Sequence, residues 1–150
     1  MYSKVKIAGH PVHPMLVSFP VAFYAASLVC YIVYNTNGDP FWFKVALVSN
    51  IAGVVMAAVA AIPGFIDWLF IPAGSNPKKT GLLHMLCNVL ALGLYTVNWW
   101  LQCDQWDATV PVIDYAIPLT AAGFLLTLVA GVLGWKMVQK HHVGVDEFPS

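Results

Sequence analysis

The chain has 150 residues, of which 59% are hydrophobic and only 9% are charged, and its mean hydropathy is +0.73. This composition lies far outside the range of water-soluble domains and indicates a membrane protein. The formal net charge is zero, so the chain lacks the basic surface that a nucleic-acid-binding protein needs.

Four apolar segments each approach or exceed the roughly 20 residues that a helix needs to cross a bilayer. Because a helix satisfies its own backbone hydrogen bonds in lipid, each segment is predicted to be a transmembrane helix. Short connections favour an all-α, up-down-up-down four-helix bundle that makes one domain of residues 1–150. No internal repeat is evident. The predicted helices are Leu16–Tyr34, Lys44–Leu69, Gly81–Leu101 and Ile113–Met137.

The lysines predict the orientation of the bundle. Six of them precede the first helix, separate the second helix from the third, or end the fourth, whereas the two opposite loops are rich in aspartate. By the positive-inside rule both termini are then predicted to be cytoplasmic. The six lysines are Lys4, Lys6, Lys78, Lys79, Lys136 and Lys140.

All five histidines fall at helix ends on this predicted cytoplasmic side. His10 and His13 each precede a proline, so we expect them on a stiff, non-helical segment that leads into the first helix. His84 is expected in the first turn of the third helix, after Thr80 as its N-cap. The remaining two, which end the fourth helix, are His141 and His142.

Three further residues are expected near these histidines. Asp67 ends the second predicted helix after a break at Pro63-Gly64, and a carboxylate at that depth is costly unless it is paired. An imidazole N–H is a suitable partner, and the contact would fix the tautomer of a ligating histidine. Asn88 follows His84 by one turn on the same helix face. Trp68 belongs to the interfacial belt and is a candidate neighbour of the site.

Two plainer interpretations stay open. Single histidines at membrane interfaces commonly reach towards water, cap helices or contact lipid headgroups, and Asp67 can act as a helix cap alone. The residue types also leave the cofactor open. Haem b fits histidines in a four-helix bundle, and imidazole with carboxylate also suits Zn, Fe or Cu ions.

Small residues in the second and fourth helices permit a porphyrin to lie between helices, although they more commonly let membrane helices approach closely. Thiol-redox and covalent-haem motifs are absent from the sequence, as are phosphate loops and hydrolase motifs, so a nucleotide-dependent or hydrolytic enzyme has no support. An electron-transfer or binding protein is expected rather than a stand-alone enzyme. The small residues include Gly53, Ala60 and Gly64 in the second helix, and Gly123, Ala130 and Gly134 in the fourth.

Four stretches of the chain together resemble the DUF2231 family of predicted bacterial membrane proteins. The resemblance covers nearly the whole chain and matches the family at His10, His13, Asp67, His84 and His141, while His142 stands where the family pattern resembles glycine. The stretches are His10–Pro20, Gly64–Pro72, Leu83-His84 with Asn88, and Gly134–Val145.

The resemblance implies four transmembrane helices and membrane redox chemistry, through kinship with di-haem b-type cytochromes and through family members that are joined to Rieske domains. Because this chain ends at Ser150 without a Rieske domain, we expect its electron partner on another chain. The protein is expected to pass electrons between this partner and a quinol or a membrane complex.

The predicted function is therefore a small b-type haem protein for electron transfer. His84 is the first axial ligand and His13, on the diagonal helix, is the opposite one. His10 and His141 hold a second haem, an ion or the propionates, and Asp67 orients one imidazole. With no histidine on the outer side, electron transfer across the whole bilayer is not expected.

Two alternatives belong to other classes of protein. In one, the chain binds a single Zn, Fe or Cu ion through the histidines and Asp67. In the other, it is an accessory subunit of a homo- or hetero-oligomeric membrane complex. The proposed ion ligands are His10, His13, His84, His141 and Asp67.

Overall fold

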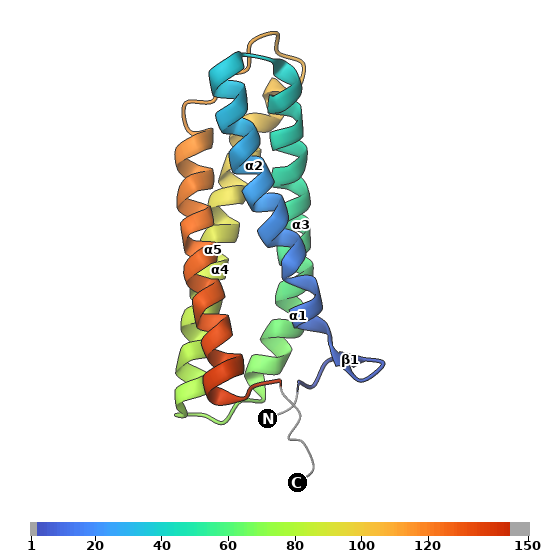
Figure 1. The fold of residues 1–150 in the computed structure, drawn as a ribbon, viewed down its shortest axis with the longest axis vertical. Helices are drawn as coiled ribbons and strands as arrows, with labels where there is room; N and C mark the ends of the chain where they lie inside the picture. Colours follow the sequence, from blue (N-terminus) through green and yellow to red (C-terminus); the bar gives the residue numbers. More distant parts are fainter. Residues whose placement is uncertain (1–2, 145–150) are drawn as a thin grey trace.

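The computed structural model describes residues 3–144, so Val145 at the end of the family pattern lies outside the described residues. Four of its helical segments are long and apolar enough to span a membrane, as predicted. Successive helices run antiparallel, and the chain enters the first and leaves the last at the same end of the bundle (Figure 1). The helices are α1 (Val12–Leu16) with α2 (Ser18–Asn37), α3 (Pro40–Leu69), α4 (Asn76–Gln102) with the 3-10 helix η1 (Cys103–Gln105), and α5 (Ala116–His141).

Capping residues explain where α3 and α4 begin. The Asp39 carboxylate accepts from the Phe41 backbone N–H, and the Ser75 hydroxyl accepts from the Lys78 N–H, so both helices start before the predicted residues. Thr80 is therefore not the N-cap of α4. His84 lies about 12 Å along this helix, in its third turn rather than its first.

The segment before α1 also differs from the prediction. His13 is helical, inside α1, because helix formation already starts at Val12. His10 lies in a two-residue strand, β2 (His10–Pro11), which pairs antiparallel with β1 (Lys6–Ile7). Residues 8 and 9 make the turn with positive φ. The expected break at Pro63-Gly64 is not formed either, since α3 continues to Leu69, and membrane helices tolerate an internal proline.

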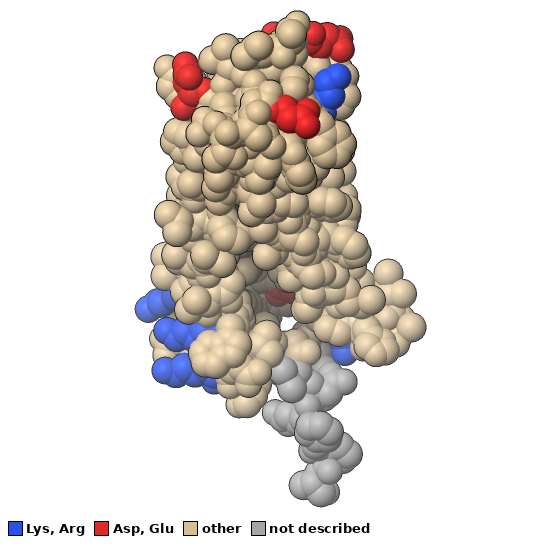
Figure 2. All heavy atoms as spheres, turned by 45° about the horizontal axis from the view of Figure 1, so that its top comes forward, with Lys and Arg blue, Asp and Glu red and all other residues tan. Residues whose placement is uncertain are grey.

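The four helices pack as two hairpins, α2 with α3 and α4 with α5, which contact each other through α3–α4 and α2–α5. Two clusters of buried residues hold the hairpins together. One, around Tyr31 and Phe43, lies near the end of the bundle opposite the chain entry. The other, around Tyr24 and Tyr95, lies closer to the end where the chain enters. Towards the end where the chain enters and leaves, the hairpins diverge (Figure 1) and the surface is hollowed (Figure 2).

Charged side chains separate along the long axis of the bundle. Most acidic residues lie at one end together with Lys44, and the other lysines lie at the opposite end, where Asp67 is also found (Figure 2). Between the two ends the outer surface is apolar, with many exposed side chains such as Val55, Leu90 and Val132. This surface suits lipid, and the assignment of the lysine end to the cytoplasm stays a prediction.

Candidate functional site

Two histidines from different hairpins meet inside the bundle. The ring centroids of His13 and His84 are 6.2 Å apart, and the ring planes are nearly perpendicular, at 89°. Their helical segments, α1–α2 and α4, lie diagonally opposite each other in the bundle, because each packs mainly against the remaining two helices. The sequence predicted this juxtaposition from the bundle topology.

Each of these imidazoles is fixed by the other helix of its own hairpin. His13 Nδ1 lies 2.8 Å from the carbonyl oxygen of Ala60, and His84 Nδ1 lies 2.8 Å from that of Ala130. A carbonyl oxygen only accepts, so each Nδ1 carries the hydrogen and donates it. In the neutral form of each ring the lone pair is then on Nε2, and this is the tautomer that binds a metal through Nε2.

A glycine lies against each ring, one helical turn after the accepting carbonyl. A Cβ atom on Gly64 would lie 2.7 Å from the His13 ring, and one on Gly134 would lie 3.3 Å from the His84 ring. Real Cβ atoms do not approach other atoms to 2.7 Å, so only glycine lets the His13 ring pack this closely on α3. The glycines thus set the position of both imidazoles.

The same arrangement recurs three helical turns further into the bundle. The rings of Tyr24 and Tyr95 stack with centroids 3.6 Å apart and planes 4° from parallel. Each tyrosine packs on a glycine of its own hairpin, since a Cβ atom on Gly53 or on Gly123 would lie 2.6 Å from the ring carbons. A histidine layer and a tyrosine layer therefore follow one another between the hairpins.

These contacts reveal an internal repeat, so the prediction that the chain has none was wrong. The histidine and tyrosine partners are 71 positions apart in the sequence, and the glycine and alanine partners are 70 apart. Sequence identity between the halves is low, which hides the repeat from inspection. The equivalent pairs are His13 and His84, Tyr24 and Tyr95, Gly53 and Gly123, Ala60 and Ala130, and Gly64 and Gly134.

The other three histidines are not brought to this pair. His10 is exposed and its Nδ1 donates to the carbonyl of Ala8, 2.9 Å away. His141 lines a separate cavity between α4 and α5, and His142 is exposed at the end of α5. Within residues 3–144, no group of three or more His, Cys, Asp or Glu side chains is close enough to hold an ion.

Asp67 has a different partner from the one predicted. Its carboxylate accepts hydrogen bonds from the Ser3 hydroxyl at 2.6 Å, the Lys4 N–H at 2.6 Å and the Val5 N–H at 3.2 Å. Because α3 stays helical past Gly64, Asp67 lies near the chain entry and holds the N-terminal segment. Backbone carbonyls, not this carboxylate, orient the two imidazoles.

Asn88 and Trp68 have separate places. The Asn88 amide donates to His84 Nε2 at 3.2 Å and to the His84 carbonyl at 2.9 Å. Trp68 instead joins α3 to the start of α4, because its indole N–H donates to the Lys78 carbonyl at 3.2 Å. The Lys78 ammonium lies 3.7 Å from the centre of the Trp68 ring.

Comparison with known proteins gave a family match. The family model described as a predicted membrane protein, DUF2231, matches residues 9–147. That range contains both hairpins, both histidines of the pair and their supporting glycines. Neither the curated proteins nor the solved structures gave a match. The family model covers nearly the whole chain, and the protein therefore belongs to the DUF2231 family of predicted membrane proteins.

Proposed function

We propose that this protein binds one b-type haem through His13 and His84 and transfers electrons within the membrane. The observation that carries the proposal is the distance between the two rings. Imidazole–metal bonds of about 2.0 Å on both sides of an ion place the ring centroids about 6.3 Å apart. The centroids of His13 and His84 are 6.2 Å apart, which is close to this spacing.

The number of side-chain ligands favours haem over a bare ion. A porphyrin supplies four nitrogen ligands to iron, so the protein needs to add only two axial imidazoles. A structural zinc site normally takes four protein ligands. The residues described here supply two, with no third ligand of the usual types at hand.

The surroundings of the pair support the same proposal. Both Nδ1–H groups are held by backbone carbonyls, an outer-shell arrangement that is typical of ligating histidines. The hairpins diverge towards this end of the bundle (Figure 1), and the surface at this end is hollowed (Figure 2). Asn88 must release His84 Nε2, and as an exposed side chain it is free to turn away.

When bound, haem supplies one-electron oxidation and reduction. The pair lies towards the lysine end of the bundle, so exchange at one membrane face is the expected reaction rather than transfer across the bilayer. A quinol and a soluble or membrane-bound redox protein, such as a Rieske protein, are the partners we propose. We also propose the bacterial cytoplasmic membrane as the location.

The test is the absorption spectrum of the protein, recorded in membranes and after purification in mild detergent, before and after reduction with dithionite. We expect a Soret band, sharp α and β bands on reduction, and about one haem per chain. His13→Ala and His84→Ala should each remove the bands. His10→Ala and His142→Ala are matched controls that should keep them.

Two other outcomes of this experiment would support the ion-binding protein or the accessory subunit instead of the haem protein. Colourless protein that carries about one Zn, Cu or Fe per chain, lost in His13→Ala, would replace haem by an ion. Protein that lacks both pigment and metal, already in the membranes, would favour an accessory subunit. His84→Met tests ligation itself, because a thioether ligand should retain haem and raise its reduction potential.

A further inference from the structure

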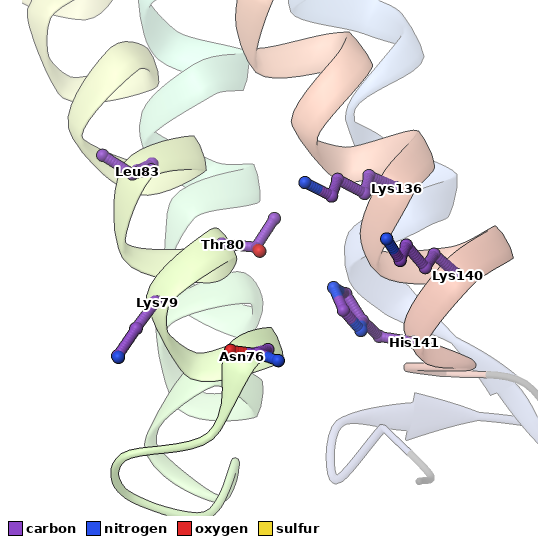
Figure 3. A pocket seen from close by; sticks show the side chains of 7 residues that line it. All are labelled: Asn76, Lys79, Thr80, Leu83, Lys136, Lys140 and His141. Carbon is purple, nitrogen blue, oxygen red and sulfur yellow. The ribbon is translucent and has the colours of Figure 1, made fainter.

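A cavity of about 210 Å³ lies between the start of α4 and the end of α5, apart from the histidine pair. Asn76 and Thr80 point into it from α4, whereas Lys136 and Lys140 extend towards α4 from α5, with His141 below them (Figure 3). Lys79 also lines the cavity, although its ammonium group points away from it (Figure 3).

Within residues 3–144, no acidic side chain balances the positive charge at this cavity. Across residues 3–144, neither Lys136 nor Lys140 has an ion pair, a hydrogen bond or an aromatic ring as a partner. Lys78, at the same end of the bundle, differs, because its ammonium donates to the Trp68 carbonyl at 2.6 Å and lies over the Trp68 ring. Two adjacent ammonium groups without a counter-charge create a local positive potential that attracts an anion.

A second observation points to a ligand. His141 Nε2 is buried and has no hydrogen-bond partner in the described part of the chain. Buried polar atoms in native proteins nearly always have one. An imidazole N–H can donate to an oxyanion, and lysine ammonium groups are common ligands of phosphate.

The position of the cavity indicates the source of the anion. It lies where two candidate membrane spans, Asn76–Gln105 and Ala116–His141, reach the lysine end of the bundle. Lipid phosphates lie at this depth, and acyl chains begin just below it. Leu83, which lines the cavity, is 54% exposed, so the cavity is bordered by apolar surface as well as by the lysines.

We propose that this cavity binds the phosphate group of an anionic phospholipid, with Lys136 and Lys140 as its cationic ligands and His141 as a hydrogen-bond donor. The site uses none of the groups that hold the proposed haem, so either proposal can fail without the other.

The experiment is a titration of the full-length protein in neutral detergent with short-chain phosphatidylglycerol, followed by native mass spectrometry. Phosphatidylcholine is the zwitterionic comparison. Each lysine near an anionic headgroup contributes about a fivefold change in affinity. We therefore expect Lys136→Gln/Lys140→Gln to weaken phosphatidylglycerol binding about thirtyfold, to the level of phosphatidylcholine.

Lys4→Gln/Lys6→Gln is the matched control, because it removes the same charge at the same end of the molecule but outside the cavity. It should change the affinity less than threefold, and circular dichroism checks that each variant keeps its helices. An equal loss in the control, or no preference of the wild-type protein for phosphatidylglycerol, would overturn the proposal. Displacement of the lipid by millimolar inorganic phosphate would assign the cavity to a soluble anion instead.

Discussion

The two hairpins are alike where they face each other and different where they reach the membrane surface. Each contributes one histidine and one tyrosine to the centre, and each supplies the glycines on which those rings lie. At the surface, the first hairpin holds the N-terminal segment through Asp67, whereas the second has Met137 at the equivalent position. The shared centre indicates a function that needs both halves, while each end has acquired a contact of its own.

The cavity between α4 and α5 is a second difference between the surface ends of the two hairpins. The two lysines and His141 on α5 correspond to apolar residues at and just after the end of α3, one of which, Ile71, is buried. The cavity therefore has no equivalent in the first half of the repeat and belongs to the second half alone. The equivalent positions are Lys136 and Ile66, Lys140 and Phe70, and His141 and Ile71.

Substitutions beside the tyrosine layer should have the largest effect on stability, and they test whether the two hairpins pack in the same way. Gly53→Ala and Gly123→Ala each place a Cβ atom 2.6 Å from a ring carbon, and neither ring can retreat because the rings stack on each other. We expect each substitution to lower the free energy of unfolding by about 3 kcal/mol. Unfolding in mixed detergent micelles, followed by circular dichroism, measures it.

Gly93→Ala and Gly131→Ala are the controls, since a Cβ atom at either position meets no atom within 4 Å. Both should be neutral or stabilising by about 0.5–1 kcal/mol, because alanine favours a helix over glycine. If all four variants behaved alike, close packing of the tyrosines would not explain the glycines.

The sequence predicts the four helices well, because their signal is a long apolar stretch that no other element produces. It places the starts of two helices too late. The first helix already begins at Val12, and capping by Ser75 lets α4 begin at Asn76, before its apolar part. It also misreads Pro63, since a proline inside a membrane helix carries no local signal that separates a break from a tolerated bend.

At the site, the sequence identifies His13 and His84 but not what holds them. The carbonyls of Ala60 and Ala130 leave no trace in residue type, so Asp67 was assigned their role. The glycines were recognised only as small residues. Comparing the chain with itself at a shift of 70 residues would have shown that Gly53, Ala60 and Gly64 recur with unchanged spacing, because positions under the same packing constraint retain the same small residue.

The histidine layer is less symmetric than the tyrosine layer, and this predicts unequal effects. A Cβ atom on Gly64 would lie 2.7 Å from the His13 ring, against 3.3 Å for Gly134 and the His84 ring. We expect Gly64→Ala to cost about 2 kcal/mol and Gly134→Ala less than about 1 kcal/mol. The proposed haem content should follow the same order. Equal losses of stability in the two variants would contradict the difference in packing.

A smaller effect should separate the surface ends of the hairpins. Asp67→Ala removes the acceptor of three hydrogen bonds from residues 3–5, and bonds to an ionised group are the stronger ones. Because these bonds hold only the N-terminal segment, we expect local opening and little change in global stability. Hydrogen exchange at the Lys4 and Val5 amides should accelerate about tenfold, which corresponds to about 1.4 kcal/mol. Asp107→Ala, at the opposite end of the bundle, should leave this exchange unchanged.

The smallest effect concerns Asn88, whose equivalent in the first hairpin is Val17. Asn88→Val makes the second hairpin resemble the first, because it removes the amide that donates to His84 Nε2 and leaves the Ala130 carbonyl in place. Asn88 is exposed, so its loss should cost about 0.5 kcal/mol. The proposed haem should be retained, since His13 occupies the matching position without such an amide. Loss of haem in this variant would show that the two imidazoles are not equivalent, and that the second hairpin needs a contact at Nε2 that the first does without.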